Sequence, residues 1–430
     1  MSATPHTFGH RLSTLLVMVG VAVGLGNVWR FPYMMGEHGG GAFLLLYLAA
    51  MVLFGVPALV AEWTLGRATG RGPAEAYASA GLPWGRAGGV LVFVVVAMAT
   101  SYYVVVIGWV FLYMFRSLAG GFAEASAAGL FRDTLAHPIP QAASAWLVLA
   151  ACASVVLAGV RRGIERISRL FVPVFFVLIL VLVARSVTLP GAGAGIRYLL
   201  TFDPGAVTGR TLLAVVGQAA FSLALGGTFM VVYGSYLPPQ QRLGRLAVET
   251  AGGDLIASLL AAFLVIPAVF AAGETPTAGP PLLFETLPLV FARVPSGALA
   301  APVFFLALGL VAFLSAVAAV EVLVSSLSAY TGWRRARVAW TVVVVEALLG
   351  IPCMLSLDYL ALSDLIWGST GQPLGSILAL VAVGWFLDRT RALESAGLRP
   401  EGLGRLWLFW IRWVAPGGVL IALVSGWLDG

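Results

Sequence analysis

Long apolar stretches separated by short polar segments repeat along almost the whole chain. A membrane-spanning helix needs about 20 consecutive apolar residues to cross a hydrocarbon core of about 30 Å. By this measure the pattern predicts about eleven spans, over residues 12–35, 42–66, 87–115, 144–160, 167–187, 211–236, 247–272, 299–330, 338–353, 362–387 and 406–428. We therefore expect an all-α membrane protein in which residues 1–430 form a single transmembrane domain.

Two of these spans contain glycines that weaken a helix near the middle of the membrane. The first span holds Gly20, Gly24 and Gly26, and the sixth holds the pair Gly226 and Gly227. In a bilayer, backbone groups freed from a helix are tolerated where they line a cavity or find other partners. The pattern predicts helices interrupted at a binding site, although such glycines also occur as close-packing surfaces between helices.

The two interrupted spans lie five helices apart, which indicates an inverted repeat. Interrupted segments at corresponding positions of two halves are typical of secondary transporters that bind substrate near the bilayer midplane. We expect the repeats over about residues 11–187 and 211–387, followed by an extra helix over about residues 406–428.

Composition and charge support this class and indicate an orientation. The chain is 60% hydrophobic and 10% charged, with a mean hydropathy of +0.97, which is far too apolar for a soluble domain. It contains no lysine. With a cytoplasmic N-terminus, the cytoplasmic side receives most arginines, and the outer side receives Arg116, Arg132, Arg185, Arg197, Arg210 and Arg293. The predicted spans then leave the C-terminus outside. The pI near 9.6 therefore reflects orientation in the lipid bilayer and not affinity for nucleic acid.

The sequence offers no catalytic or metal-binding motif. Its two cysteines, Cys152 and Cys353, imply neither a disulfide framework nor a metal cluster. The histidines have no metal-ligand spacing: His6, His10, His38 and His137. We find no Walker loop, nucleophile elbow or pair of catalytic carboxylates in a water-accessible domain. We therefore expect neither an enzyme nor an organic cofactor.

Several motifs resemble the neurotransmitter:sodium symporter family. They are GLGNVWRFPY at Gly24–Tyr33, HGGGAF at His38–Phe43, EWTLGR at Glu62–Arg67, the pair Tyr102-Tyr103, and Gly217–Ser222. The likeness extends to about residue 387, and the length resembles bacterial members without a twelfth helix. The resemblance implies a leucine-transporter-type fold with unwound helices 1 and 6. It also implies a sodium-coupled symporter that works by alternating access in the plasma (inner) membrane of a bacterium.

The resemblance places an amino-acid substrate at the interrupted helices. Its carboxylate would meet main-chain donors at Leu25 and Gly26 and the hydroxyl of Tyr103. Gly24 stands where monoamine carriers of the family have an aspartate, which favours a substrate that brings its own carboxylate. The other implied substrate positions are apolar and mostly small: Ala22, Ala99, Phe221, Ala224, Gly227, Ala316 and Val320. We expect a hydrophobic, bulky neutral L-amino acid.

Sodium prefers hard oxygen ligands, and the resemblance implies two sodium sites. The first would use the carbonyl of Ala22 with Asn27, Ser222, Asp254 and the substrate carboxylate. The second would use the carbonyls of Gly20, Val23 and Ala312 with the Ser315 hydroxyl. An ionisable residue within a span is costly and usually functional, so a cation is the obvious partner of Asp254. Because chloride-dependent members have an asparagine at that position, the resemblance implies chloride-independent transport.

The same resemblance suggests gates at both ends of the site. The outer gate would consist of a charged pair and an aromatic lid: Arg30 with Asp364, and Tyr103 with Phe221. At the inner end the family's N-terminal Arg-x-x-Trp latch is replaced by residues 5–8, and its acidic partner appears as Tyr330. Stacking of Phe8 near Tyr236 is an alternative way to hold that gate. We interpret Glu62 and Glu321, which lie within spans, as polar contacts inside the bundle.

Two other functions stay open at this point. A proton-coupled or exchanging amino-acid carrier of similar architecture would take up substrate independently of sodium. A non-transporting sensor would bind an amino acid without flux.

Overall fold

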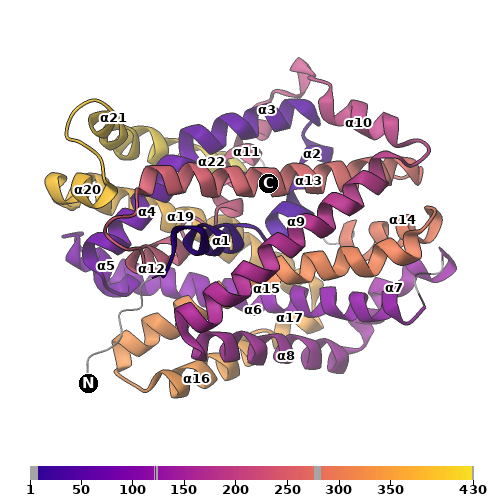
Figure 1. The fold of residues 1–430 in the computed structure, drawn as a ribbon, viewed down its shortest axis with the longest axis horizontal. Helices are drawn as coiled ribbons and strands as arrows, with labels where there is room; N and C mark the ends of the chain where they lie inside the picture. Colours follow the sequence, from indigo (N-terminus) through magenta and orange to yellow (C-terminus); the bar gives the residue numbers. More distant parts are fainter. Residues whose placement is uncertain (1–7, 121, 123, 276–281, 429–430) are drawn as a thin grey trace.

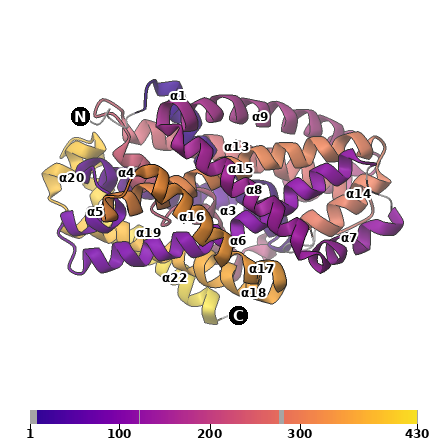
Figure 2. The same ribbon diagram turned by 90° about the horizontal axis from the view of Figure 1, so that it is seen from below.

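The chain forms a bundle in which most long helices run along one direction (Figure 1). The computed structural model describes residues 8–120, 122, 124–275 and 282–428. Within these ranges the regular structure is helical, apart from an isolated bridge between Gly40 and Phe202. One end of the bundle, here called the Phe8 end, carries α5 (Pro73–Ser79), α12 (Phe229–Ser235) and α20 (Arg389–Ala396). The opposite end, called the α7 end, carries α7 (Glu124–Ala136), α10 (Ala192–Leu200) and α14 (Leu287–Arg293) (Figures 1 and 2).

Eight helices of the described residues are long and apolar enough to cross a membrane, and a bent pair at the start of the chain raises this to as many as nine. The eight are Gly41–Thr69 (α3, η2 and α4), Gly85–Leu118 (α6), Pro138–Leu157 (α8), Val160–Val187 (η3 and α9), Leu243–Ala271 (α13), Gly297–Thr331 (α15), Arg335–Leu355 (α16 and α17) and Leu357–Phe386 (α18, η6, α19 and η7). The span predicted over residues 211–236 is divided between α11 (Gly209–Ser222) and α12. The span over 406–428 comprises α21 (Leu403–Phe409), η8 (Trp410–Val414) and α22 (Ala415–Leu428).

The first helix breaks within the glycine-rich stretch. Helix α1 (Arg11–Ala22) ends where Val23 turns extended, at φ −75° and ψ 122°. The chain resumes as η1 (Gly26–Arg30) and α2 (Phe31–Glu37), bent by 54° from α1. A Cβ atom on Gly24 would lie only 2.7 Å from the Ser315 hydroxyl, so the break depends on a residue without a side chain. The amide oxygen of Asn27 accepts a 2.9 Å hydrogen bond from the Gly24 N–H, which satisfies one freed donor.

A second break separates α11 from α12. Three residues in it have positive φ: Ala224 at 50°, Gly226 at 78° and Thr228 at 55°. At Gly226, a Cβ atom would lie 1.6 Å from the Gln372 carbonyl oxygen, so no other residue fits there. The Gly226 N–H donates to the buried Glu62 carboxylate at 2.7 Å. The expected polar contact of Glu62 within the bundle is therefore confirmed, and it stabilises the break.

Small residues bring α12 into direct backbone contact with α4 (Val56–Thr69). A Cβ atom on Gly66 would lie 1.9 Å from the Val231 carbonyl oxygen, and one on Gly234 would lie 2.7 Å from backbone atoms of Trp63. Close backbone approach of this kind is typical of helices packed in a membrane. The half-helix that follows the second break is thereby fixed against a long, continuous helix.

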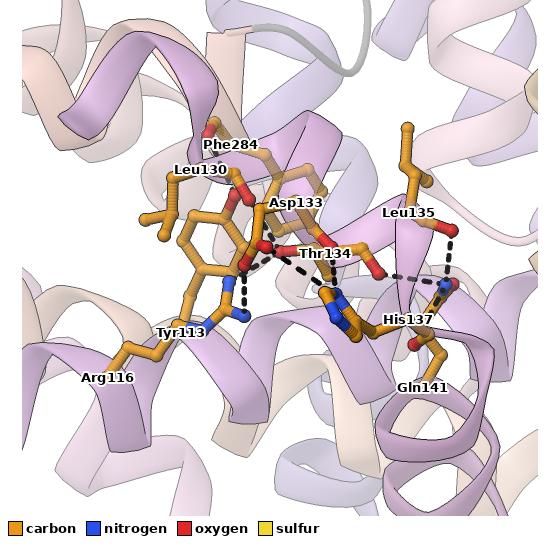
Figure 3. A network of polar contacts seen from close by, with 9 residues as sticks. All are labelled: Tyr113, Arg116, Leu130, Asp133, Thr134, Leu135, His137, Gln141 and Phe284. Atoms are coloured by element: carbon orange, nitrogen blue, oxygen red, sulfur yellow. Dashed lines mark hydrogen bonds and ion pairs between the residues drawn. The ribbon is translucent and has the colours of Figure 1, made fainter.

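Polar contacts fix α7 across its end of the bundle (Figure 3). Asp133 lies between Arg116 at 3.2 Å and the ring of His137 at 3.4 Å. The Tyr113 hydroxyl donates to the Phe284 carbonyl at 3.0 Å, and the Gln141 side chain donates to the Thr134 carbonyl at 3.0 Å. These contacts join the polar loop predicted between the third and fourth spans to the helices below it. They give that end of the molecule a fixed wall.

We predict that Gly226→Ala destabilises the protein strongly, because the added methyl group would overlap the Gln372 carbonyl and Gly226 has a left-handed backbone. Gly217→Ala is the matched control, since Gly217 lies within α11 with open space around its Cβ position. The melting temperature of the purified protein should fall by roughly 5 °C or more for Gly226→Ala and stay level or rise for Gly217→Ala. Equal melting temperatures for both variants would contradict this account of the break.

Candidate functional site

A cavity of about 70 Å³ lies between the two breaks. Its wall is mostly apolar, and the polar groups in it come from hydroxyls, one amide and main chain at the first break. The lining residues are Val21, Ala22, Gly24, Leu25, Gly26, Ala99, Thr100, Tyr102, Tyr103, Phe221, Ala224, Phe229, Ser315, Ala319 and Gln372. Residues far apart in the sequence therefore meet at one small site in the middle of the bundle.

Main-chain groups of the first break face this cavity. The Leu25 N–H points toward the Tyr103 hydroxyl at 3.5 Å, and the Gly26 carbonyl accepts a 3.0 Å hydrogen bond from Gln218. The first N–H groups of a helix have no partner within the helix and carry a partial positive charge. With the Tyr103 hydroxyl beside them, these groups can hold a carboxylate.

A buried polar cluster lies behind the first break. The side-chain nitrogen of Asn27, which carries two hydrogens, lies 2.7 Å from Asp254, 3.0 Å from Ser222 and 2.9 Å from Ser258. The Ser222 hydroxyl lies 2.8 and 2.9 Å from the two Asp254 carboxylate oxygens, and the Tyr47 hydroxyl donates to the same carboxylate at 3.2 Å. The structure thus brings together Asn27, Ser222 and Asp254, three of the residues placed at the first sodium site.

This cluster suits a cation. Among the described residues, the partners of the fully buried Asp254 carboxylate are the neutral side chains of Asn27, Ser222 and Tyr47, and an ionised carboxylate deep in a membrane needs a balancing charge. The donor set consists of oxygen atoms and one amide, which suits a hard ion such as sodium better than a transition metal. Within the described ranges, no group of three or more His, Cys, Asp or Glu residues could hold a metal ion.

A second group of oxygen atoms converges where α1 ends. The Ser315 hydroxyl lies 3.2 Å from the Val23 carbonyl, 3.4 Å from that of Val21 and 3.4 Å from that of Val311. Ser315 and Val23 belong to the expected second sodium site. The Val311 contact is the bond of the hydroxyl to the carbonyl one turn back on the same helix, and the Ala312 carbonyl stays a prediction. Gly20, which packs against Leu314, lies one turn earlier on α1.

Helix register explains which α15 residues reach the cavity. Ser315 and Ala319 are four residues apart and share one face of the helix, so both line the cavity. Ala316 and Val320, which were expected there, each lie one residue further along and are buried elsewhere. Gly227 does not line the cavity either. The i, i+4 spacing from Ser315 is the signal in the sequence that would have indicated Ala319.

The expected lid separates the central cavity from a larger one toward the α7 end. The larger cavity has a volume of about 520 Å³. Both cavities share only the residues that form the partition: Leu25, Tyr102, Tyr103 and Phe221. The guanidinium carbon of Arg30 lies 4.6 Å from the centre of the Phe221 ring. The aromatic pair Tyr103 and Phe221 thus lies between the central cavity and the larger one, here called the vestibule.

The expected charged pair of this gate is not in contact. Among the described residues, Arg30 and Asp364 form no direct ion pair; Arg30 covers Phe221, and Asp364 accepts a 2.9 Å hydrogen bond from the Tyr102 hydroxyl. Arg30 belongs to η1, and Asp364 begins η6 (Asp364–Gly371). A closed pair would require η1 and η6 to approach each other.

At the Phe8 end an aromatic cluster closes the bundle. The Phe8 ring packs 6.2 Å from Tyr233 and 6.1 Å from Tyr236, and the Phe8 N–H donates to the Tyr236 carbonyl at 3.2 Å. The Gly9 N–H donates to the buried Glu165 carboxylate at 2.7 Å. The Phe8 ring thus lies near Tyr236 as predicted, edge to face and not stacked, and its role in holding a gate stays a prediction. Residues 5–7 of the expected latch lie outside the described residues.

An ion pair at this end comes from residues that the sequence prediction did not pair. The fully buried Glu321 carboxylate pairs with Arg335 and accepts a 2.8 Å hydrogen bond from the Tyr236 hydroxyl. Tyr330, the position compared with the family's acidic residue, is 82% exposed. Glu321 and Arg335 do not stand at the positions compared with the family's inner pair, so they form a separate ion pair, and the prediction for Tyr330 is unchanged. Glu321 lies two and a half turns earlier on α15 and supplies a carboxylate.

Together these features define a multi-pass membrane protein of the secondary-transporter class, with two broken helices around a central site. A model of the sodium:neurotransmitter symporter family matches residues 5–128 and 133–425. An uncharacterized sodium-dependent transporter of Bacillus subtilis, YhdH, is 32% identical over 98% of this chain and 97% of its own length. Another from Haemophilus influenzae is 30% identical over 97% of both chains. The chain belongs to the sodium:neurotransmitter symporter family.

Solved and more distant relatives agree with this assignment. The crystal structure of MhsT in complex with L-phenylalanine superimposes with a TM-score of 0.89 at 34% identity, covering 97% of this chain and 99% of MhsT. The mouse sodium-dependent neutral amino acid transporter B(0)AT3 is 32% identical over 60% of this chain and 46% of its own length. The all-helical fold is therefore that of the leucine-transporter type.

Glu321→Gln should destabilise the protein far more than Glu75→Gln. The first change leaves Arg335 without its buried counter-charge, which typically costs about 3–5 kcal/mol. The second removes an exposed pair in which Arg71 and Glu75 are 59% and 57% exposed, so its effect should be small. Thermal unfolding of both purified variants measures the difference. A similar shift for the two would show that the Glu321 pair contributes no more than a surface contact.

Proposed function

We propose that this protein is a sodium-coupled symporter that imports hydrophobic, bulky neutral L-amino acids by alternating access, without a requirement for chloride. The observation that carries the proposal is the apolar cavity between two broken helices, with main-chain donors on one side and the Asp254 cluster behind them. We place the protein in the plasma (inner) membrane of a bacterium, with its N-terminus in the cytoplasm and its C-terminus outside. Residues 1–430 act as one domain with two inverted repeats.

The substrate class follows from the groups that face the cavity. The Leu25 and Gly26 main chain and the Tyr103 hydroxyl offer donors to a carboxylate, while Gly24 offers no carboxylate to an amine. Ala99 and Ala319 leave room opposite these donors for a side chain, and no charged residue lines the cavity. MhsT has been solved with L-phenylalanine, and B(0)AT3 is named a neutral amino acid transporter, which supports the same substrate class here.

Sodium would be held by the two groups of oxygen atoms described above. Asn27, Ser222 and Asp254 would contribute to one site, and Val23 and Ser315 to the other. Asp254 supplies a fixed negative charge beside the first site, so no chloride is needed there. Each sodium ion that enters gains about 2.3 kcal/mol across 100 mV, and a tenfold gradient adds about 1.4 kcal/mol. Two ions could sustain a roughly 10⁵-fold substrate gradient.

The gates support alternating access. The vestibule reaches the lid from the α7 end, while Phe8 and the Glu321 pair close the opposite end. Approach of Arg30 and Asp364 would close the outer side, and separation of Phe8 from Tyr236 would open the inner one. In repeat-built transporters these motions are largely rocking of one helix bundle against the other around a fixed site.

Uptake into proteoliposomes tests this function. Labelled phenylalanine, leucine, alanine, glutamate and glycine should show strong uptake of the bulky apolar substrates in sodium, and none when choline replaces sodium. Replacement of chloride by gluconate should leave uptake unchanged. Uptake that persists without sodium would favour a proton-coupled or exchanging carrier, and binding without uptake would favour a sensor.

Asp254→Ala should abolish sodium-dependent uptake, because Asn27 and Ser222 lose the charge that balances the ion. Glu346→Gln is the control: Glu346 is a buried carboxyl on α16 that makes no hydrogen bond with residues of either ion site, and its loss should leave sodium dependence intact. The measurement is initial uptake against sodium concentration. Full sodium-dependent uptake by the Asp254 variant would remove this residue from the site.

Ala319→Leu should reverse the preference for large substrates. The larger side chain would fill the cavity opposite the main-chain donors, so KM for phenylalanine should rise by roughly tenfold or more. Alanine, which leaves that part of the cavity empty, serves as the internal control and should change little. Unchanged discrimination between the two substrates would place the side-chain pocket elsewhere.

A further inference from the structure

Arg412 lies inside the last predicted span, yet its structural role uses only part of its hydrogen-bonding capacity. Its Nε–H donates to the carbonyl of Gly384, which belongs to η7 (Ala382–Phe386), the last turn of its span. Leu387 then turns extended, at φ −66° and ψ 134°, so the chain leaves the helix. The last carbonyls of a helix have no intrahelical partner, and a basic side chain is a suitable cap. Arg412, which belongs to η8, therefore caps the last turn of the neighbouring helix η7.

Two neighbours place Arg412 along the bundle. Three residues further on, Ala415 lines a small void together with Leu225 and Ser376, near the second break. In the other direction, Arg389 begins α20, at the Phe8 end, five residues after Gly384. Arg412 thus lies between the level of the central site and the Phe8 end.

The guanidinium keeps donors for an additional partner. It carries five N–H groups, and the Gly384 carbonyl takes one of them. Throughout the described ranges, neither terminal nitrogen of Arg412 makes a hydrogen bond or ion pair with protein. The side chain is partly exposed on the outside of the bundle. A charged group at this depth is costly without a counter-charge, so its partner must come from the surroundings.

Two tryptophans flank the guanidinium. Its carbon lies 5.9 Å from the centre of the Trp385 ring, and the rings of Trp385 and Trp413 meet edge to face at 4.5 Å. The two side chains are 47% and 59% exposed, and the Trp385 N–H donates to the Arg412 carbonyl at 3.3 Å. Tryptophan is enriched at the level of lipid headgroups, where its apolar body and its N–H are both accommodated. The pair marks this level on the outside of the bundle.

Further positive charge lies toward the nearby end of the bundle. Arg389, Arg399 and Arg405 are exposed on α20, the following loop and α21. Asp388, Glu394 and Glu401 are exposed there too, so these arginines are interspersed with carboxylates. Exposed arginines beside a membrane surface attract anionic lipids.

We propose that Arg412, with Trp385 and Trp413, binds the phosphate of an anionic phospholipid from the leaflet at the Phe8 end. The terminal nitrogens of the guanidinium match two phosphate oxygens in a bidentate arrangement. The acyl chains lie along the apolar outside of the bundle, where Phe409 and Phe386 are exposed. Depth within the span favours a lipid over free phosphate, because an inorganic anion would have to leave water.

Native mass spectrometry of the full-length protein in detergent tests this site, with phosphatidylglycerol titrated against phosphatidylcholine. Wild type should bind its first phosphatidylglycerol more tightly than its first phosphatidylcholine. Arg412→Gln should lower the affinity for the first phosphatidylglycerol by about tenfold or more. Arg405→Gln, at an exposed position without aromatic neighbours in ring contact, should change it less than threefold. Millimolar inorganic phosphate should not displace the lipid.

Several outcomes would overturn the proposal. One is that Arg412→Gln binds phosphatidylglycerol as tightly as wild type, and another is that Arg405→Gln loses as much affinity as Arg412→Gln. The others are that wild type does not prefer phosphatidylglycerol over phosphatidylcholine, or that inorganic phosphate displaces the bound lipid. If Arg412→Gln fails to fold, Arg412→Lys replaces it, because lysine keeps the charge. Lysine cannot form the bidentate contact, so its affinity for phosphatidylglycerol should still fall by about threefold or more, and wild-type affinity in that variant would exclude the site.

Discussion

The structure depends on where the main-chain groups freed at two helix breaks find their partners. In a membrane interior each unsatisfied backbone group costs several kcal/mol, so a broken helix survives only with dedicated partners. Asn27 accepts from the Gly24 N–H, Gln218 donates to the Gly26 carbonyl, and Glu62 accepts from the Gly226 N–H. Each partner is a buried polar side chain that would be unfavourable in a continuous apolar bundle. The breaks and these side chains stabilise one another.

The same constraint explains how substrate and ions can be coupled. The groups that are not fully used by these partners, around Leu25, Val23 and Ser315, face a cavity or converge on one another. A carboxylate would accept hydrogen bonds from the free main-chain donors, and a cation would bind the converging oxygen atoms. The two ligands have opposite charges. Binding of one therefore favours binding of the other, which is the thermodynamic basis of symport.

Sequence reasoning identified features that arise from local chemistry. Glycines at 24 and 226 indicated the breaks because glycine weakens a helix, and in the structure close contacts exclude a side chain at both positions. Asp254 stood out because a carboxylate within an apolar span requires a partner. The same logic predicted the all-helical membrane fold, and the family motifs predicted Tyr103 and Phe221 as a lid.

Features that depend on exact register or on tertiary pairing were missed. The prediction placed Val320 at the cavity, whereas Ala319, one residue earlier on α15, lines it. One residue along a helix rotates the side chain by about 100°. The pairing of Glu321 with Arg335 joins the middle of one span to the start of the next, and no local pattern indicates it. The separation of Arg30 from Asp364 reflects a conformational state, which a sequence does not specify.

The most direct test of the central claim is an experimental structure with sodium and L-phenylalanine bound. The account predicts the ligand carboxylate against the main chain at Leu25 and Gly26 and the Tyr103 hydroxyl, with one sodium ion beside Asp254 and another near Ser315. An amino acid bound away from the two breaks, or helices that run continuously through them, would contradict it.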